Sequence, residues 1–166
     1  MNDTTLDALI ARVAALEAQN AVRKTIARYM ALCDVPARAF DGETLGALFT
    51  ENAVWEGVGS HYAGKFGRLK GRADIVAMLA RYLPPAPHFA VNVHFLTSEH
   101  IEADGDTAKG RWIMLQASGY VDEKAELISA RLDIDFVPSD HGTWLISHFR
   151  TERLFDAPWH VRGMPA

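Results

Sequence analysis

The second half of the chain is the part that most restricts the fold, because it holds four long strand-like runs separated by short turns. The runs read "HFAVNVHFLTSEHIEA", "TAKGRWIMLQASGYV", "ELISARLDIDFVP" and "TWLISHFRTERLF". Between them lie "DGD", "VDEK" and "SDHG", which are rich in the residues that turns require. Such an order is typical of an antiparallel meander.

The first half of the chain is dominated by helical patterns. Apolar residues recur at helical spacing from residue 6 to residue 33, and Pro36 then ends the pattern. A second short helix is expected in "DGETLGALF" with Asp41 as its cap, then a strand in "ENAVWEGV" and a third helix in "GRADIVAMLARYL". Helices followed by an antiparallel meander indicate an α+β fold. We expect one domain over residues 1–166, with a core at about 5–155 and a C-terminal tail at 156–166.

The two faces of the expected strands are both partly apolar. Around His94, one face carries Asn92 and Leu96 and the other carries Val93 and Phe95, because alternate residues of a strand share a face. Neither face of the next strand is plainly polar. We therefore expect two different coverings, a pocket roofed by the helices on one side and a subunit interface on the other.

Composition excludes several classes of function. The formal net charge is −4, and the Lys and Arg residues are scattered, so no nucleic-acid partner is expected. The N-terminus lacks the basic start and continuous apolar core of a signal peptide, and no stretch approaches the ~18 apolar residues of a membrane span. A cytoplasmic location and no membrane partner are the expectations.

No familiar cofactor or nucleophile motif is present. The seven histidines are dispersed and show no short-spaced ligand set, so no metal site is expected. The glycines of "GVGSHYAGKFG" lack the spacing of a phosphate-binding loop, and no G-x-S-x-G motif supports a serine hydrolase. We expect no cofactor.

Four stretches together resemble a known family. They are "RYMALCD", "DGETLGALFTENAVWEG", "VHFLTSEHIEADGDTAKG" and "SARLDIDFVPSDHGTWLISHF". Their order and spacing are similar to those of the SnoaL-like group of the nuclear transport factor 2-like superfamily, which includes scytalone dehydratase, hexachlorocyclohexane dehydrochlorinase and a bile-acid dehydratase. The resemblance covers about residues 5–155. It implies a cone-shaped, strongly curved antiparallel sheet closed by the N-terminal helices, the cystatin-like α+β barrel.

The resemblance also implies a catalytic pair, Asp34 after the first helix and His94 on the first long strand. Tyr29 stands before Asp34 at the spacing found in the bile-acid dehydratase. The sequence departs from scytalone dehydratase at Ser118, where that enzyme has a second histidine, and at Arg131, where it has an asparagine. A histidine held by a carboxylate can act as a general base near neutral pH. From spacing alone, Asp34 could equally be a helix terminator and His94 a residue on a mixed sheet face.

Further residues are candidates for contact with a substrate. Tyr29 could donate a hydrogen bond to a substrate oxygen or simply pack on the sheet, and Arg131 could bind a carboxylate or pair with a nearby aspartate. His148 lies on the last strand and could approach the pocket. The residues that could line an apolar pocket or its mouth, or else belong to the core or surface, are Trp55, Trp112, Met114, Tyr120 and His88.

We therefore expect a cofactor-independent lyase or isomerase that removes a proton from a small, apolar cyclic or aromatic hydroxy or keto compound. Dehydration, carbon–carbon cleavage and isomerisation need the same groups. The alternative is a non-catalytic module of the same fold that binds a small ligand or only assembles. Related enzymes imply a homo-oligomer, a trimer or a dimer.

Overall fold

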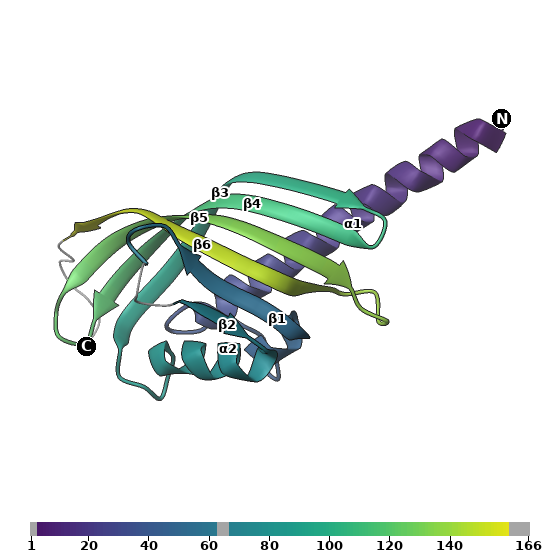
Figure 1. Ribbon diagram of the computed structural model, residues 1–166. Helices are drawn as coiled ribbons and strands as arrows, with labels where there is room; N and C mark the ends of the chain where they lie inside the picture. Colours follow the sequence, from purple (N-terminus) through teal and green to yellow (C-terminus); the bar gives the residue numbers. More distant parts are fainter. Residues whose placement is uncertain (1–2, 63–66, 160–166) are drawn as a thin grey trace.

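The computed structural model describes residues 3–62 and 67–159. These residues form two α-helices, two short 3-10 helices and one six-stranded sheet with the order β2-β1-β6-β5-β4-β3 (Figure 1). In chain order the elements are α1 (Asp3–Cys33), η1 (Leu45–Leu48), β1 (Phe49–Val58), β2 (Arg68–Lys70), α2 (Arg72–Leu79), η2 (Ala80–Tyr82), β3 (Phe89–Asp104), β4 (Thr107–Tyr120), β5 (Ala125–Pro138) and β6 (Trp144–Pro158).

Helix α1 divides into a projecting half and a packed half (Figure 1). In its second half, one face contacts β3, β4 and β6 and is buried; it carries Val22, Ile26, Tyr29, Met30 and Cys33. These residues follow the 3- and 4-residue spacing of one helical face. The first half extends beyond the sheet and leaves its apolar residues exposed.

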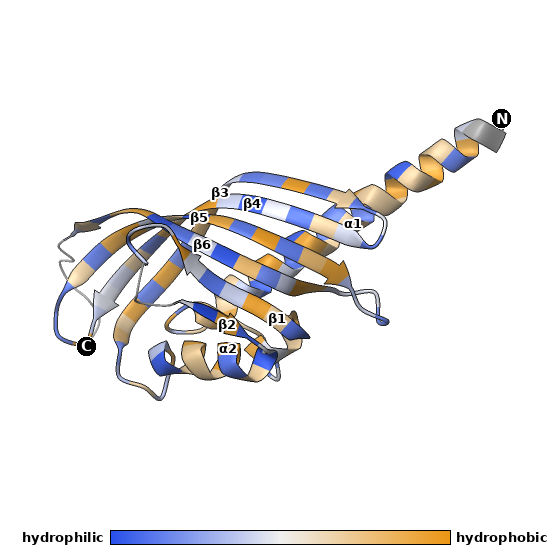
Figure 2. Cartoon of the chain, in the orientation of Figure 1, coloured by the Kyte–Doolittle hydropathy of each residue, from blue (hydrophilic) through white to orange (hydrophobic). Residues whose placement is uncertain are grey.

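The expected α+β architecture is confirmed, and strands β3 to β6 form the antiparallel meander. Hydrophobic and hydrophilic residues alternate along these strands (Figure 2). On β5, Leu132, Ile134 and Phe136 are each at most 1% exposed, and they face the helices. Burial of each such side chain contributes about 1.5–3 kcal/mol. The core therefore lies between the curved sheet and the helices.

Two sequence expectations differ from the structure, and one short strand was not expected. The stretch 41–49 forms only the 3-10 turn η1, because three apolar residues interrupted by Gly46 are too short to sustain an α-helix. The sheet is mixed rather than fully antiparallel, since β1 runs parallel to β6. Strand β2, which pairs with β1, has only three residues and no sequence signal.

The C-terminal strand is longer than expected. Strand β6 reaches Pro158, so residues 156–158 belong to the sheet and not to a tail. The rest of the expected tail, residues 160–166, lies outside the described residues. Within the described part of the chain, no helix is long and apolar enough to cross a membrane.

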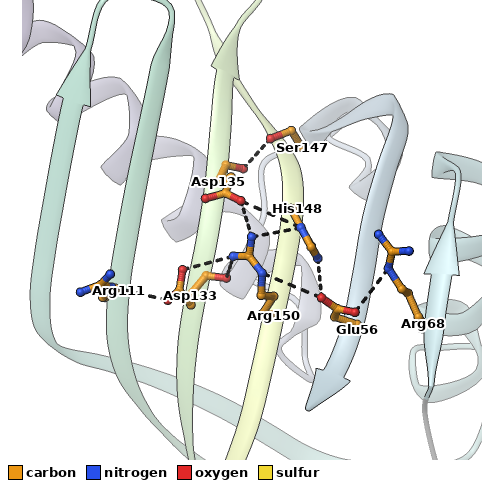
Figure 3. Close-up of polar contacts among 8 residues, drawn as sticks. All are labelled: Glu56, Arg68, Arg111, Asp133, Asp135, Ser147, His148 and Arg150. Atoms are coloured by element: carbon orange, nitrogen blue, oxygen red, sulfur yellow. Dashed lines mark hydrogen bonds and ion pairs between the residues drawn. The ribbon is translucent and has the colours of Figure 1, made fainter.

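The sheet face turned away from the helices carries a network of charged and polar side chains, which we call the outer network (Figure 3). Acidic and basic side chains from β1, β2, β4, β5 and β6 alternate in it, so each charge lies beside an opposite one. Its members are Glu56, Arg68, Arg111, Asp133, Asp135, Ser147, His148 and Arg150.

Candidate active site

The end of α1 is fixed to the sheet beside β3. The helix closes with a backbone hydrogen bond from Asp34 N to the Met30 carbonyl at 2.9 Å. Val35 and Asn92 then exchange two backbone hydrogen bonds, of 2.8 and 2.9 Å, in an antiparallel bridge. This bridge places Asp34 next to His94, because alternate residues of β3 point to the same side.

The Asp34 carboxylate is 1% exposed and has every oxygen satisfied by a donor. Its Oδ1 atom accepts the backbone N–H of His94 at 3.0 Å and lies 2.9 Å from the ring Nδ1 atom of the same residue. Its Oδ2 atom accepts the guanidinium of Arg38, with Nε and Nη2 each at 2.8 Å. A buried charge held by three groups in this way is compensated rather than orphaned.

These contacts set the protonation of the pair. Burial of Asp34 raises its pKa, but the bonds from His94 and Arg38 outweigh burial, so the pKa lies below the ordinary value of 3.8. An ionised carboxylate only accepts hydrogen bonds, so the Nδ1 atom of His94 carries the proton. In this tautomer the Nε2 atom carries the lone pair that can accept a proton.

His94 forms part of the wall of a cavity of about 210 Å³ between the sheet and the helices. The wall is mainly aromatic and aliphatic, with a few polar groups. It consists of Tyr29, Met30, Cys33, Trp55, Tyr62, Met78, Leu79, Tyr82, Leu83, His88, Phe89, Asn92, His94, Met114, Gln116, Tyr120, Ile128, Leu132, Phe149, Thr151 and Arg153. Asp34 is not among them, so it lies behind His94 as seen from the cavity.

Tyr29 lies on the same wall and is held by aromatic neighbours. Its ring meets Phe49 edge-on at 5.9 Å and Phe149 at a tilt at 4.9 Å. Burial raises the Tyr29 pKa well above 10.0, and the Cys33 thiol acts in the same direction. Burial likewise raises the pKa of Cys33 to about 12. Tyr29 therefore stays a neutral phenol, able to donate one hydrogen bond.

The structure brings most of the sequence-predicted site residues together. Trp55, Met114, Tyr120 and His88 line the cavity with Tyr29 and His94. The Trp55 indole stacks on Phe149 with the ring centroids 6.0 Å apart. Burial raises the Tyr120 pKa to about 12, with further upward contributions from Glu126, whose carboxylate accepts the Tyr120 hydroxyl at 2.9 Å.

Two of the predicted substrate contacts lie elsewhere. Trp112 is a core residue whose ring covers Gly110, where a Cβ atom would come within 2.0 Å of it. Its indole N–H donates to Glu99 at 3.3 Å. Arg131 points away from the cavity and donates to Glu152 at 2.7 Å, with its side chain 55% exposed.

His148 also faces away from the cavity and belongs to the outer network (Figure 3). Its Nδ1 atom lies 3.0 Å from the Nη2 atom of Arg150, which can only donate, and its Nε2 atom lies 2.7 Å from Glu56. The ring therefore donates through Nε2 to Glu56. It forms a second histidine–carboxylate pair, remote from the cavity.

Sequence reasoning missed a buried amide network beside His94. The Asn92 Oδ1 atom accepts hydrogen bonds from Gln116 at 2.9 Å and from Ser118 at 2.8 Å, and Asn92 Nδ2 donates to the Cys33 carbonyl at 3.3 Å. Strand alternation placed Asn92 on the His94 face, but it did not show which face of the next strand lies beside it. The lack of charge on these three side chains gave no chemical signal that they would form a network.

Arg153 is another cavity residue that sequence reasoning missed. Counting alternate residues from Trp144 and Ile146, both buried, would direct it away from the cavity. The register shifts by one residue near Ser147, because Phe136 pairs with Ile146 but Asp135 pairs with His148. After this bulge, Phe149, Thr151 and Arg153 face inward.

Metal ligands do not converge in the described part of the chain. No group of three or more His, Cys, Asp or Glu side chains in residues 3–62 and 67–159 is arranged to hold a metal ion. The chemistry that the cavity offers comes from a histidine paired with a carboxylate, a neutral phenol, side-chain amides and a guanidinium.

Comparison with solved structures places this fold among known ones. A hexachlorocyclohexane dehydrochlorinase of type 3 from Novosphingobium barchaimii LL02 superposes with a TM-score of 0.70 at 17% identity, covering 95% of this chain and 99% of that one. A protein provisionally named scytalone dehydratase from Novosphingobium aromaticivorans DSM 12444 gives 0.68 at 21% identity, covering 98% and 94%. A nuclear transport factor 2-like protein with a cystatin-like fold from Novosphingobium aromaticivorans gives 0.67 at 28%, covering 93% and 92%.

The sequence itself identifies the family. No functionally curated protein matches it. The sequence profile of the SnoaL-like domain, however, matches residues 14–150, which include α1 from residue 14 onward, the sheet up to the middle of β6, and both members of the Asp34–His94 pair. The chain therefore belongs to the SnoaL-like domain family, within the nuclear transport factor 2-like superfamily.

Proposed function

We propose that this protein is a lyase or isomerase that needs no cofactor and acts by removing a proton from a small cyclic or aromatic hydroxy or keto compound. The observation that carries the proposal is the 2.9 Å contact between Asp34 and His94, with His94 on the cavity wall. The fold shared with a dehydrochlorinase supports an elimination reaction.

In a dehydration, His94 takes the proton from the carbon next to a substrate carbonyl through its Nε2 atom. The electron pair of that C–H bond forms a double bond, and the carbon–oxygen bond of the β-hydroxyl breaks. The imidazolium then gives its proton to the leaving hydroxide, so water departs and His94 is regenerated. Asp34 holds the ring in the required tautomer and stabilises the imidazolium.

Tyr29 supplies the stabilisation of the oxygen that gains negative charge. It is a neutral donor in a wall made mostly of apolar side chains, where a hydrogen bond to a developing oxyanion is stronger than in water. Carbon–carbon cleavage and keto–enol isomerisation use the same groups. In the cleavage, the pair removes the hydroxyl proton instead of a carbon-bound proton.

Turnover and binding, measured separately, test the proposal. Wild type and His94→Ala are compared on a panel of cyclic β-hydroxyketones and aryl alcohols, with His148→Ala as the matched control on the outer face. We expect turnover by wild type and His148→Ala, and binding without turnover by His94→Ala. Binding by all three proteins with no turnover by wild type would instead identify a binding module.

We infer that the protein forms a homo-oligomer through the projecting half of α1. Leu6, Leu9, Val13 and Leu16 are 43–55% exposed and follow the alternating 3- and 4-residue spacing of a coiled-coil seam. The occupant that fits is a second copy of the same helix. In a parallel pair, Arg12 of one copy and Glu17 of the other flank this seam with opposite charges.

A further inference from the structure

We propose that Arg153 forms a carboxylate-binding subsite in the cavity, so that the substrate is a small ring compound bearing a carboxylate. This inference rests on the proposed function, since it names the substrate class of the same cavity. Arg153 lies on β6 and lines the cavity together with Thr151 and Phe149.

The guanidinium of Arg153 is incompletely paired. Its Nη1 atom lies 3.4 Å from the Asp156 carboxylate, which is long for a charge-assisted hydrogen bond. Its Nε atom is buried and has no hydrogen-bond partner among the described residues. An arginine has five N–H donors, and the described residues leave several of them without a strong acceptor, so the guanidinium keeps donors for a ligand carboxylate.

The neighbours of Arg153 in the cavity do not neutralise it. The Tyr62 ring lies 6.0 Å from the guanidinium carbon. Burial raises the pKa of Tyr62 above 10.0, and the charge of Arg153 and hydrogen bonds with Thr151 and Arg153 oppose that shift, so the phenol is an uncharged partner of Arg153 at neutral pH. Tyr120 is likewise a neutral phenol, whose hydroxyl donates to Glu126.

The described residues that line the cavity include no aspartate or glutamate. Arg153 is therefore the lining side chain with a fixed formal charge, in a wall that is otherwise aromatic, aliphatic or neutral polar. A charge facing such surroundings interacts more strongly with an opposite charge than it would in water. A guanidinium presents a planar pair of donors that matches the two oxygens of a carboxylate.

Arg153 and His94 lie on different parts of the wall. They are on β6 and β3, which are three strand spacings apart in the sheet, or roughly 14 Å measured across the strands. The pairing register gives the same separation. Arg153 pairs with Ala130, which pairs with Met114, which pairs with Leu96 on β3, two residues from His94. A substrate that reaches both residues has its carboxylate on the side away from the reacting carbon.

The cavity volume fits a ring between the two groups. An apolar cavity of roughly 150 Å³ is large enough to hold benzene. The cavity here measures about 210 Å³, which leaves room for a ring with short substituents. The wall residues Trp55, Phe149 and Tyr29 supply aromatic contacts for that ring.

A matched pair of probes isolates the carboxylate. Calorimetric titration with cinnamate and with its neutral isostere cinnamamide is carried out on wild type, Arg153→Gln and Arg131→Gln. Arg131, on the neighbouring strand and paired with Glu152 outside the cavity, serves as the matched control. If Arg153→Gln fails to fold, Arg153→Lys replaces it, since lysine keeps the charge but loses the planar pair of donors.

We expect wild type and Arg131→Gln to bind cinnamate at least about tenfold more tightly than cinnamamide. One hydrogen bond to a charged group contributes about this much to the affinity. Arg153→Gln should lose this preference through weaker cinnamate binding, and Arg153→Lys should retain only part of it. Equal affinities in wild type, a preference that persists in Arg153→Gln, or no binding of either probe at millimolar concentration would overturn the inference.

The same titrations on His94→Gln separate this inference from the proposed function. The carboxylate preference should persist in His94→Gln, because it depends on Arg153. If His94→Gln loses the preference for cinnamate over cinnamamide, while turnover still depends on His94, the carboxylate subsite alone is refuted. A preference that is present, with turnover unaffected by His94, would refute the proposed mechanism alone.

Discussion

The Asp34 carboxylate lies 2.9 Å from the Nδ1 atom of His94, although 60 residues separate the two in sequence. The contact depends on the Val35–Asn92 bridge, which fixes the end of α1 to β3. The outer network contains a second pair of the same kind, Glu56 and His148, which does not reach the cavity. The protein therefore carries its own control for experiments on the first pair.

Asp34→Asn should lower kcat by about 10²–10⁴-fold and change KM little. An amide cannot stabilise the imidazolium, and it can select the wrong tautomer of His94. Steady-state kinetics on a substrate found in the panel checks this. Glu56→Gln should keep nearly full activity, and an equal loss in the two variants would mean that the defect is one of folding.

Protonation of Asp34 should lower the free energy of unfolding at acidic pH. Its folded pKa lies below the unfolded value of 3.8, so its contribution to the free energy of unfolding is fully present well above pH 3.8. That contribution is lost as the pH falls through the folded pKa. Urea unfolding across this range should show the difference between wild type and Asp34→Asn shrinking toward low pH; a difference that grows would contradict the assigned pKa direction.

Asn92→Ala should destabilise the protein by about 1–3 kcal/mol, because it removes the acceptor of the buried Ser118 hydroxyl and the side-chain donor to the Cys33 carbonyl. Chemical denaturation measures the change. The turn variant Ser139→Ala, which loses a solvent-exposed hydrogen bond to Thr143, should stay within about 0.5 kcal/mol of wild type. An Asn92→Ala protein as stable as the Ser139→Ala control would show that the amide network contributes little.

The double variant Leu9→Ser, Val13→Ser should lower the assembled mass. Both side chains lie in the exposed seam of α1, and burying them against a second copy is the expected source of association. Light scattering coupled to size exclusion gives the mass, and Ala11→Ser, Ala14→Ser is the control on the other sides of the helix. A wild-type protein that runs as a monomer would rule out the pairing.

Much of the fold was readable from the sequence because its signals are local. Pro36 ends α1 and turn residues separate β3 to β6, so the order of the elements follows from short stretches. The parallel pairing of β1 with β6 was not readable, since no local pattern specifies which distant strand a segment joins. Strand β2 is too short to carry a pattern.

The candidate site divides in the same way. Strand alternation placed Asn92 and His94 on one face of β3, and the family resemblance pointed to Asp34. The bulge near Ser147 reverses the two faces of β6, so His148 was left open and Arg153 was missed. A one-residue insertion moves every following side chain to the opposite face, and the sequence around it shows no break in composition.

The most direct test of the account is deuterium uptake from D₂O at the carbon next to the carbonyl of a bound cyclic ketone, followed by proton NMR. This measurement detects proton removal whether or not elimination follows. We predict exchange well above the buffer rate with wild type and His148→Gln, and its loss by about 10²-fold or more with His94→Gln. Exchange by His94→Gln at the wild-type rate, or none by wild type, would contradict the assignment of His94 as the base.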